Sequence, residues 1–278
     1  MDAHRIARVT HGAARDLAWL AGAHIALKTH QCLAEKWAAQ VLGDPSSVDI
    51  RNYPAKEAEK LRRFVVESLL ELAPFANGSA TDLVGGLLNK AAIVYADAVL
   101  QWMLIHVKEA AVGTLGQKRS VKALMEEIDK DLKNAAAPKS AHPSLQRVAN
   151  KTRTLTFLPY AKWALFTAQL RHLIVHKMGK VDMPFRLNTG LMTWKQALNE
   201  ARNKSCKPKD LGLVEPQPPM PLRMWRMVDG KRLWPSKATF EEDYKLGTQA
   251  ALGIVEVVLP CIRYCARYAC SVCRYFQA

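Results

Sequence analysis

The sequence lacks the short motifs that mark the common catalytic folds. It has no phosphate-binding glycine loop, no metalloprotease helix with paired histidines and no nucleophile elbow. Hydrolysis of nucleotides by a P-loop enzyme and acyl transfer from an activated serine are therefore disfavoured. β-Branched residues seldom alternate with polar ones and no internal repeat is evident, so neither a sheet protein nor a solenoid is predicted.

Disulfide and metal patterns are also scarce. The six cysteines do not follow the spacing of a secreted scaffold, and four of them are crowded between Cys261 and Cys273. On one continuous helix the last two of these would point about 120–180° away from the first two, so the four thiolates cannot close one zinc tetrahedron. We expect small buried thiols and neither a metal nor another cofactor.

No signal peptide or membrane span is predicted. The apolar run from Leu17 to Leu27 is interrupted by His24, and no small-residue cleavage site follows it. The apolar run at 250–262 is too short to cross a bilayer and contains Glu256. Together with the reduced thiols, these features favour a cytoplasmic protein.

The composition is strongly basic. Forty Lys and Arg residues outnumber 25 Asp and Glu residues, which gives a formal charge of +15 and a pI near 9.7. Solubility does not require so much positive charge, and the excess favours a polyanionic partner such as nucleic acid. A basic but otherwise ordinary protein is the alternative.

Apolar residues recur at helical spacing along most of the chain, which predicts an all-α helical bundle. We expect one helical domain over 1–278, with an N-terminal extension at 1–45 and a core formed by 80–185 and 240–278. Thr193 and Gln196 have capping-box spacing, which supports a helix starting near Trp194. The predicted helices cover residues 2–42, 55–73, 80–112, 117–135, 155–178, 194–204 and 240–276.

A proline-rich insertion is expected at 204–238, because its prolines exclude a long helix. Within it, Asp229-Gly230 separates two short runs, which predicts a β-hairpin with a two-residue turn. Basic residues beside Trp225 and Trp234 suit phosphate binding with base stacking, although tryptophans in a hairpin also pack onto a core. The candidate RNA-binding residues of this segment are Arg223, Arg226, Lys231 and Arg232.

A second basic surface is predicted on the last helix. A helical wheel puts three arginines in one narrow stripe with three tyrosines beside it, which would suit an RNA groove and equally the solvated face of an amphipathic helix. These residues are Arg263, Arg267 and Arg274, and Tyr264, Tyr268 and Tyr275. Lys177 and Lys180 are further candidates for RNA binding.

The most informative stretch runs from Arg171 to Asp182. Arginine clamps a phosphate with its fork of N–H groups and histidine exchanges a proton near neutral pH, so the pair can bind an RNA backbone and move its protons without a metal. On a helix, His172 and His176 lie on the face opposite the apolar residues, and Arg171 lies about 140° from His176. For the guanidinium of Arg171 and the ring of His176 to meet, the long arginine side chain must span this angle or the helix must fray near Gly179. The alternative is an arginine bound to a helix carbonyl or a carboxylate, beside two surface histidines.

This stretch resembles the HEPN family of all-helical nucleases and nucleotide-binding domains. The family motif is an arginine, a polar residue, a few apolar residues and a histidine at the end of a core helix, here Arg171, His172 and His176. Many members continue in the pattern His-x-x-Gly-x-Val-Asp, which this chain follows from His176 to Asp182. The firm resemblance covers about 155–185. Toxin members often have a tyrosine two residues after the histidine, where this chain has Met178.

The resemblance implies a metal-independent endoribonuclease in which two copies of the motif meet across a homodimer. Arg171 and His176 would be the catalytic pair, and His172 the supporting polar residue. His176 would take the proton of a ribose 2′-hydroxyl, the oxygen would attack the adjacent phosphorus, and Arg171 would stabilise the added negative charge, leaving a 2′,3′-cyclic phosphate. The family also implies a toxin or an antiviral effector, with an antitoxin or another defence protein as its partner.

Two other functions remain open. A non-catalytic nucleic-acid-binding protein, or a subunit of a ribonucleoprotein, would use the same basic faces, and replacing His176 would then change nothing catalytic. A helical scaffold or antitoxin-like partner of an acidic protein would not show salt-sensitive RNA binding.

Overall fold

A computed structural model describes residues 1–29, 80–115, 119–176, 182–188, 192–211 and 248–277, together with Leu213 and single positions between 36 and 67. The side chains of residues 28–29, 80–87 and 248–257 lie outside this description. The predicted β-hairpin and most of the predicted helix at 55–73 also lie outside the described residues.

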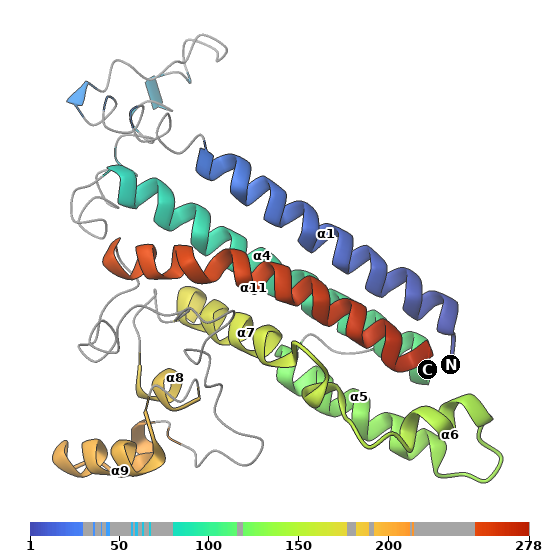
Figure 1. Cartoon of the computed structure of the whole chain (residues 1–278). Helices are drawn as coiled ribbons and strands as arrows, with labels where there is room; N and C mark the ends of the chain where they lie inside the picture. Colours follow the sequence, from blue (N-terminus) through green and yellow to red (C-terminus); the bar gives the residue numbers. More distant parts are fainter. Residues whose placement is uncertain are drawn as a thin grey trace.

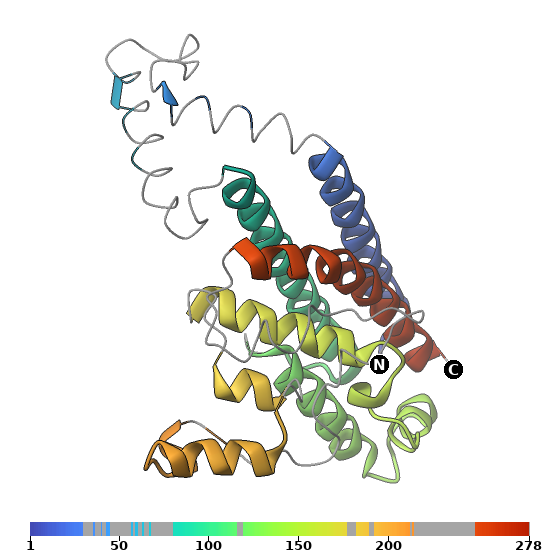
Figure 2. The ribbon, with the colours of Figure 1, turned by 60° about the vertical axis from the view of Figure 1, so that its left-hand side comes forward.

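Four long helices form the main body of the fold. α1 (Ala3–Thr29), α4 (Ala80–Val112) and α11 (Thr248–Gln277) pack against one another, and α7 (Ala161–His176) packs against α4 and α11 (Figures 1 and 2). The described part of the chain is mostly helical and contains no strand, which confirms the all-α class. Buried side chains of α1, assigned from the sequence to an extension, belong to the same core as those of α4 and α11.

A glycine ends α4, and a serine begins the next helix. Gly113 has a φ of 78°, a left-handed conformation that glycine adopts readily, and its N–H donates to the Glu109 carbonyl at 2.9 Å. Ser120 caps α5 (Val121–Ala136), because its hydroxyl accepts the N–H of Ala123 at 3.3 Å. The chain thereby turns so that α5 packs against α4.

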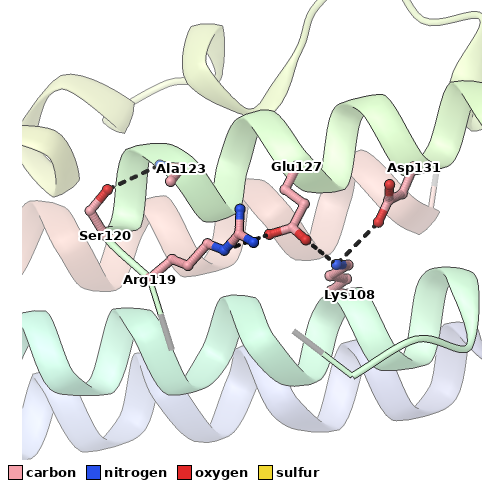
Figure 3. A network of polar contacts seen from close by, with 6 residues as sticks. All are labelled: Lys108, Arg119, Ser120, Ala123, Glu127 and Asp131. Atoms are coloured by element: carbon pink, nitrogen blue, oxygen red, sulfur yellow. Dashed lines mark hydrogen bonds and ion pairs between the residues drawn. The ribbon is translucent and has the colours of Figure 1, made fainter. Parts of the chain in front are cut away.

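A buried cation joins α5 to α4. The side chain of Lys108 is 6% exposed, and its Nζ lies 2.6 Å from Glu127 and 3.1 Å from Asp131 (Figure 3). Burial alone lowers the pKa of Lys108, but hydrogen bonds and charge from the two carboxylates outweigh burial and raise it. Arg119 adds a longer contact to Glu127, at 3.9 Å. Lys108 is therefore held charged, as a tie between two helices.

The continuous helix predicted at 155–178 is wrong at its start. The chain makes a 3₁₀ turn, η3 (Leu155–Phe157), and α7 begins at Ala161. Pro159 explains the break, because the residue before a proline is driven into extended backbone, and Leu158 has φ −64° and ψ 155°. Tyr160 then has a positive φ of 68°.

The peptide of Leu155 fixes this turn to the bundle. Its N–H donates to both carboxylate oxygens of Asp129 on α5, at 3.0 and 3.2 Å, and its carbonyl accepts the hydroxyl of Tyr268 on α11 at 3.2 Å. Burial raises the pKa of Asp129 to about 6, although the Leu155 N–H acts in the opposite direction. Three elements therefore meet at one peptide.

Shorter helices complete the described chain. α6 (Pro143–Ala149) and α8 (Met183–Asn188), which the sequence does not predict, precede α9 (Trp194–Asn203) and the 3₁₀ helix η4 (Pro208–Leu211). The capping box that begins α9 is confirmed, because both of its reciprocal hydrogen bonds are present. α8 and α9, with Met192 and Leu213 from the adjoining segments, form a small second core, and Leu211 of η4 packs against it. The core residues are Met183, Leu187, Met192, Ala197, Ala201 and Leu213.

One described helical segment, Leu88–Val112 of α4, is long and apolar enough to cross a membrane by length and composition. Half of its most apolar stretch is buried inside the fold, and the core helix of a bundle has the same composition. The segment is therefore weak evidence for a membrane.

Candidate active site

The end of α7 brings the predicted arginine and histidine together. Nη1 of Arg171 lies 3.0 Å from Nε2 of His176, and the His172 and His176 rings are 5.0 Å apart between centroids. Both histidines are exposed, and the Arg171 side chain is 30% exposed. The long arginine side chain spans the angle between the two positions within the described helix.

The helix is oriented by its apolar side. Trp163, Phe166, Leu170 and Leu173 are buried in the main core, as the helical wheel predicts, and this fixes the histidines on the opposite, solvent-facing side. Thr167 is also buried, and its hydroxyl bonds the Trp163 carbonyl at 2.8 Å and contacts Sγ of Cys265 at 3.3 Å.

A carboxylate from α4 completes the site. Oδ2 of Asp97 lies 3.7 Å from Nε of Arg171 and accepts a hydrogen bond from Nε2 of Gln101 at 2.6 Å. The Asp97 side chain is 2% exposed, and its Oδ1 is buried without a hydrogen-bond partner among the described residues. Burial raises the pKa of Asp97 to about 6, although the Arg171 charge and the Gln101 hydrogen bond act in the opposite direction.

Asp97 was missed by reasoning from the sequence. One signal was available: Asp97 is the single charged residue between Lys90 and Lys108, in an apolar stretch of α4. A charge at such a position needs a partner, because burying an isolated carboxylate is costly. The sequence gives no means of deciding that the partner is Arg171, 74 positions further along the chain.

The contact between Arg171 and His176 requires one particular protonation state of the histidine ring. A guanidinium can only donate, so Nε2 of His176 must accept, and the imidazole is then neutral with its proton on Nδ1. In this contact the guanidinium occupies the Nε2 lone pair. When Nη1 of Arg171 turns to a phosphate, the freed lone pair of the neutral imidazole can take a proton from a hydroxyl. The arrangement is suited to acid–base chemistry on a phosphodiester.

The arginine stripe on α11 is exposed, but its predicted tyrosine border is wrong. Arg263, Arg267 and Arg274 all face solvent, whereas Tyr268 and Tyr275 are buried. Their hydroxyls bond the carbonyls of Leu155 and Val148 inside the bundle, at 3.2 and 3.4 Å. Tyr264 is half-buried. α11 contacts α1, α4 and α7, so a wider part of its surface is covered than one apolar stripe.

The remaining candidate residues lie outside the described part of the chain. These are Lys177, Lys180, Arg223, Arg226, Lys231 and Arg232. Among the described residues, Cys261, Cys265 and Cys273 are buried, and no group of three or more His, Cys, Asp and Glu side chains could hold a metal.

No family model, no curated protein sequence and no solved structure matches this chain. Function is therefore inferred from the geometry of the site and from the motif of α7.

Proposed function

We propose that the protein is a metal-independent endoribonuclease of the HEPN type. The observation that carries the proposal is the 3.0 Å contact between Arg171 and His176 at the exposed end of α7, in a chain with a formal charge of +15. The site combines a proton acceptor with a phosphate-binding cation, and the charge of the chain attracts a polyanion.

In the proposed reaction, the phosphate draws Nη1 of Arg171 away from His176, and the freed Nε2 takes the proton of a ribose 2′-hydroxyl as the oxygen attacks the adjacent phosphorus. Arg171 stabilises the additional negative charge on the phosphoryl oxygens. The bond to the 5′-oxygen breaks, that oxygen takes up a proton from solvent water, and the products are a 2′,3′-cyclic phosphate and a 5′-hydroxyl. Asp97 acts as a positioning residue, since it orients the guanidinium from the buried side. His172, whose ring lies 5.0 Å from that of His176, is the supporting polar residue.

We also propose that the enzyme is a homodimer, joined through exposed apolar side chains of α4 and α7. Tyr95 and Trp102 are each 46% exposed, and Val175 on α7 is 45% exposed. At about 100° per residue, Tyr95 and Trp102 lie about 20° apart on one face of α4, and Val175 lies about 40° from Arg171 on α7. Exposed apolar residues on a shared face are typical of interfaces, and a two-fold interface uses the same patch on both copies.

A toxin or antiviral effector in the cytoplasm, with an antitoxin or another defence protein as its partner, is the setting that the HEPN resemblance favours. This setting rests on the motif from Arg171 to His176 alone.

A second candidate function is non-catalytic nucleic-acid binding. The exposed stripe of Arg263, Arg267 and Arg274 favours it, because none of the three has a carboxylate within 4 Å among the described residues. Such a protein would bind RNA in a salt-dependent way without cutting it.

The two functions are separated by comparing three proteins: wild type, His176→Ala and Lys162→Ala, an exposed cation on the same helix. Each is incubated with mixed RNA in excess chelator, and RNA binding is measured in parallel by filter retention. Loss of general-base catalysis costs about 10²–10⁴ in rate, so His176→Ala should bind RNA but cut at background, while Lys162→Ala still cuts. RNA left intact by the wild type, or equal cutting by all three proteins, would reject the nuclease.

A further inference from the structure

Three aromatic rings form a stack at the opposite end of α7 from the histidines. The rings of Trp163 and Tyr264 are 4.8 Å apart with an angle of 25°, and those of Tyr264 and Tyr160 are 5.4 Å apart with an angle of 16°. Exposure increases along this aromatic stack, from 6% for Trp163, through the half-buried Tyr264, to 36% for Tyr160. The stack therefore begins in the core and ends at the surface.

The backbone of Tyr160 is strained where it presents the ring. Its φ of 68° lies in the left-handed region, which costs free energy for any residue with a Cβ. The Tyr160 carbonyl accepts the N–H groups of Trp163 at 2.9 Å and Ala164 at 3.4 Å, so the residue also starts α7. A glycine would meet the backbone requirement at less cost, and the tyrosine adds an exposed ring.

An arginine lies over the stack. The guanidinium carbon of Arg267 is 5.3 Å from the centre of the Tyr264 ring and 5.7 Å from that of Tyr160. Contact with two ring faces holds a guanidinium by cation–π attraction without using its N–H donors. Arg267 is exposed, and among the described residues no carboxylate lies within 4 Å of it.

Further positive charge lies next to Arg267 on α11. Arg263 lies one turn before Arg267, is exposed and has no ion pair among the described residues. Phe157, in the 3₁₀ turn before α7, is 54% exposed. Exposed rings together with cations that keep their donors available match the two halves of a nucleotide, a base and a phosphate.

We infer that Tyr160, Tyr264 and Arg267 form a binding site for single-stranded RNA, in which a base stacks on the exposed end of the aromatic stack and Arg267 binds a neighbouring phosphate. The inference rests on the proposed function, since it assigns where the substrate strand is held. The 16 residues of α7 span about 24 Å, so the stack binds the strand several nucleotides away from the Arg171–His176 pair. A protein partner would need an acidic surface and would not require stacking.

The test measures binding of fluorescein-labelled RNA to the full chain in a His176→Ala background, which prevents cleavage. The probes are a 12-nucleotide oligo-U and an abasic oligomer with the same backbone. Tyr160→Gly removes the ring and suits the positive φ, Tyr160→Phe keeps the ring, and Arg267→Ala removes the cation. Arg274→Ala is the matched control, because Arg274 is exposed on the same stripe and makes no ring contact among the described residues.

Loss of one stacking base corresponds to about a 5- to 100-fold weaker dissociation constant. Tyr160→Gly should therefore weaken oligo-U binding by at least fivefold without changing binding of the abasic oligomer, and Tyr160→Phe should bind oligo-U like the parent. Arg267→Ala should weaken binding of both probes more than Arg274→Ala. Circular dichroism and the melting temperature check that each variant is folded.

Equal oligo-U binding by Tyr160→Gly and the parent would overturn the stacking site, and so would equal losses for Arg267→Ala and Arg274→Ala, which indicate net charge alone. The outcome is independent of cleavage. If stacking is found but the wild type leaves RNA intact, the proposed nuclease fails and the binding site stands. If the wild type cuts RNA and Tyr160→Gly binds oligo-U normally, the binding site fails and the proposed nuclease stands.

Discussion

Asp97 on α4 meets Arg171 on α7, with 3.7 Å between Oδ2 and Nε. The carboxylate is buried and the guanidinium is partly exposed, so Arg171 is held from inside the bundle while its outer nitrogen lies 3.0 Å from His176. A charged group in the core thus positions a cation at the surface. Such an arrangement costs stability and is expected where geometry matters for function.

Replacing Asp97 with Asn should stabilise the protein at neutral pH. The pKa of Asp97 is raised from 3.8 to about 6 on folding, so between these values the folded state binds more protons than the unfolded state, and stability falls as pH rises. The amide of the Asp97→Asn variant does not ionise, so this position no longer lowers the stability as pH rises. We expect it to exceed the wild type by about 1–3 kcal/mol in free energy of unfolding at pH 7.5, and to match it near pH 4.

Urea denaturation at both pH values measures this difference. Asp129 is the internal control, because burial raises its pKa to about 6 as well, and it remains in the Asn variant. Part of the pH dependence should therefore persist. A variant that is less stable than the wild type at pH 7.5 would show that the ion pair with Arg171 outweighs the burial of Asp97.

Replacing Trp102 with Glu should dissociate the proposed dimer. The Trp102 ring is 46% exposed, and a carboxylate placed in a self-complementary apolar interface meets its own copy. Sedimentation velocity should show a monomer, and RNA cleavage should fall by tenfold or more if two sites act together. Trp19→Glu is the control, since this 68% exposed tryptophan lies on α1. Equal sedimentation of the wild type and both variants would argue against this surface.

Replacing Lys108 with Met should destabilise the bundle. The change removes the cation from Glu127 and Asp131, whose side chains are 22% and 30% exposed, and breaking a buried ion pair costs about 3 kcal/mol. Lys122→Ala removes an exposed pair with Glu126 at 3.8 Å and should change the free energy of unfolding by less than about 0.5 kcal/mol. Similar unfolding midpoints for the two variants would mean that the Lys108 network contributes little.

Much of the fold could be predicted from periodicity and end signals. The helix at 80–112 is confirmed at both ends, and the capping box of Thr193 and Gln196 begins α9. α6 was missed because no helix was predicted between 135 and 155, although Pro143 is well suited to the first turn of a helix. The break at Pro159 was missed for the opposite reason, because the apolar pattern continues across it.

Only the part of the site that lies on α7 could be predicted from the sequence. Arg171, His172 and His176 belong to one helix, so the motif and the wheel indicate their faces without tertiary information. Asp97 comes from another helix, and a contact between helices depends on packing that a single helical wheel does not contain. Tyr268 was misplaced for the same reason, because α11 is covered on several sides.

The most direct test of the account is the cleavage of RNA and of 2′-O-methyl RNA of the same sequence by the purified protein in excess chelator. Transesterification needs a free 2′-hydroxyl, so we predict that the unmodified strand is cut to fragments ending in 2′,3′-cyclic phosphate and that the methylated strand stays intact. Arg171→Ala and His176→Ala should each abolish the cyclic ends. Cleavage of both strands, fragments that end in a 3′-hydroxyl, or activity that appears only after a divalent metal is added would contradict the account.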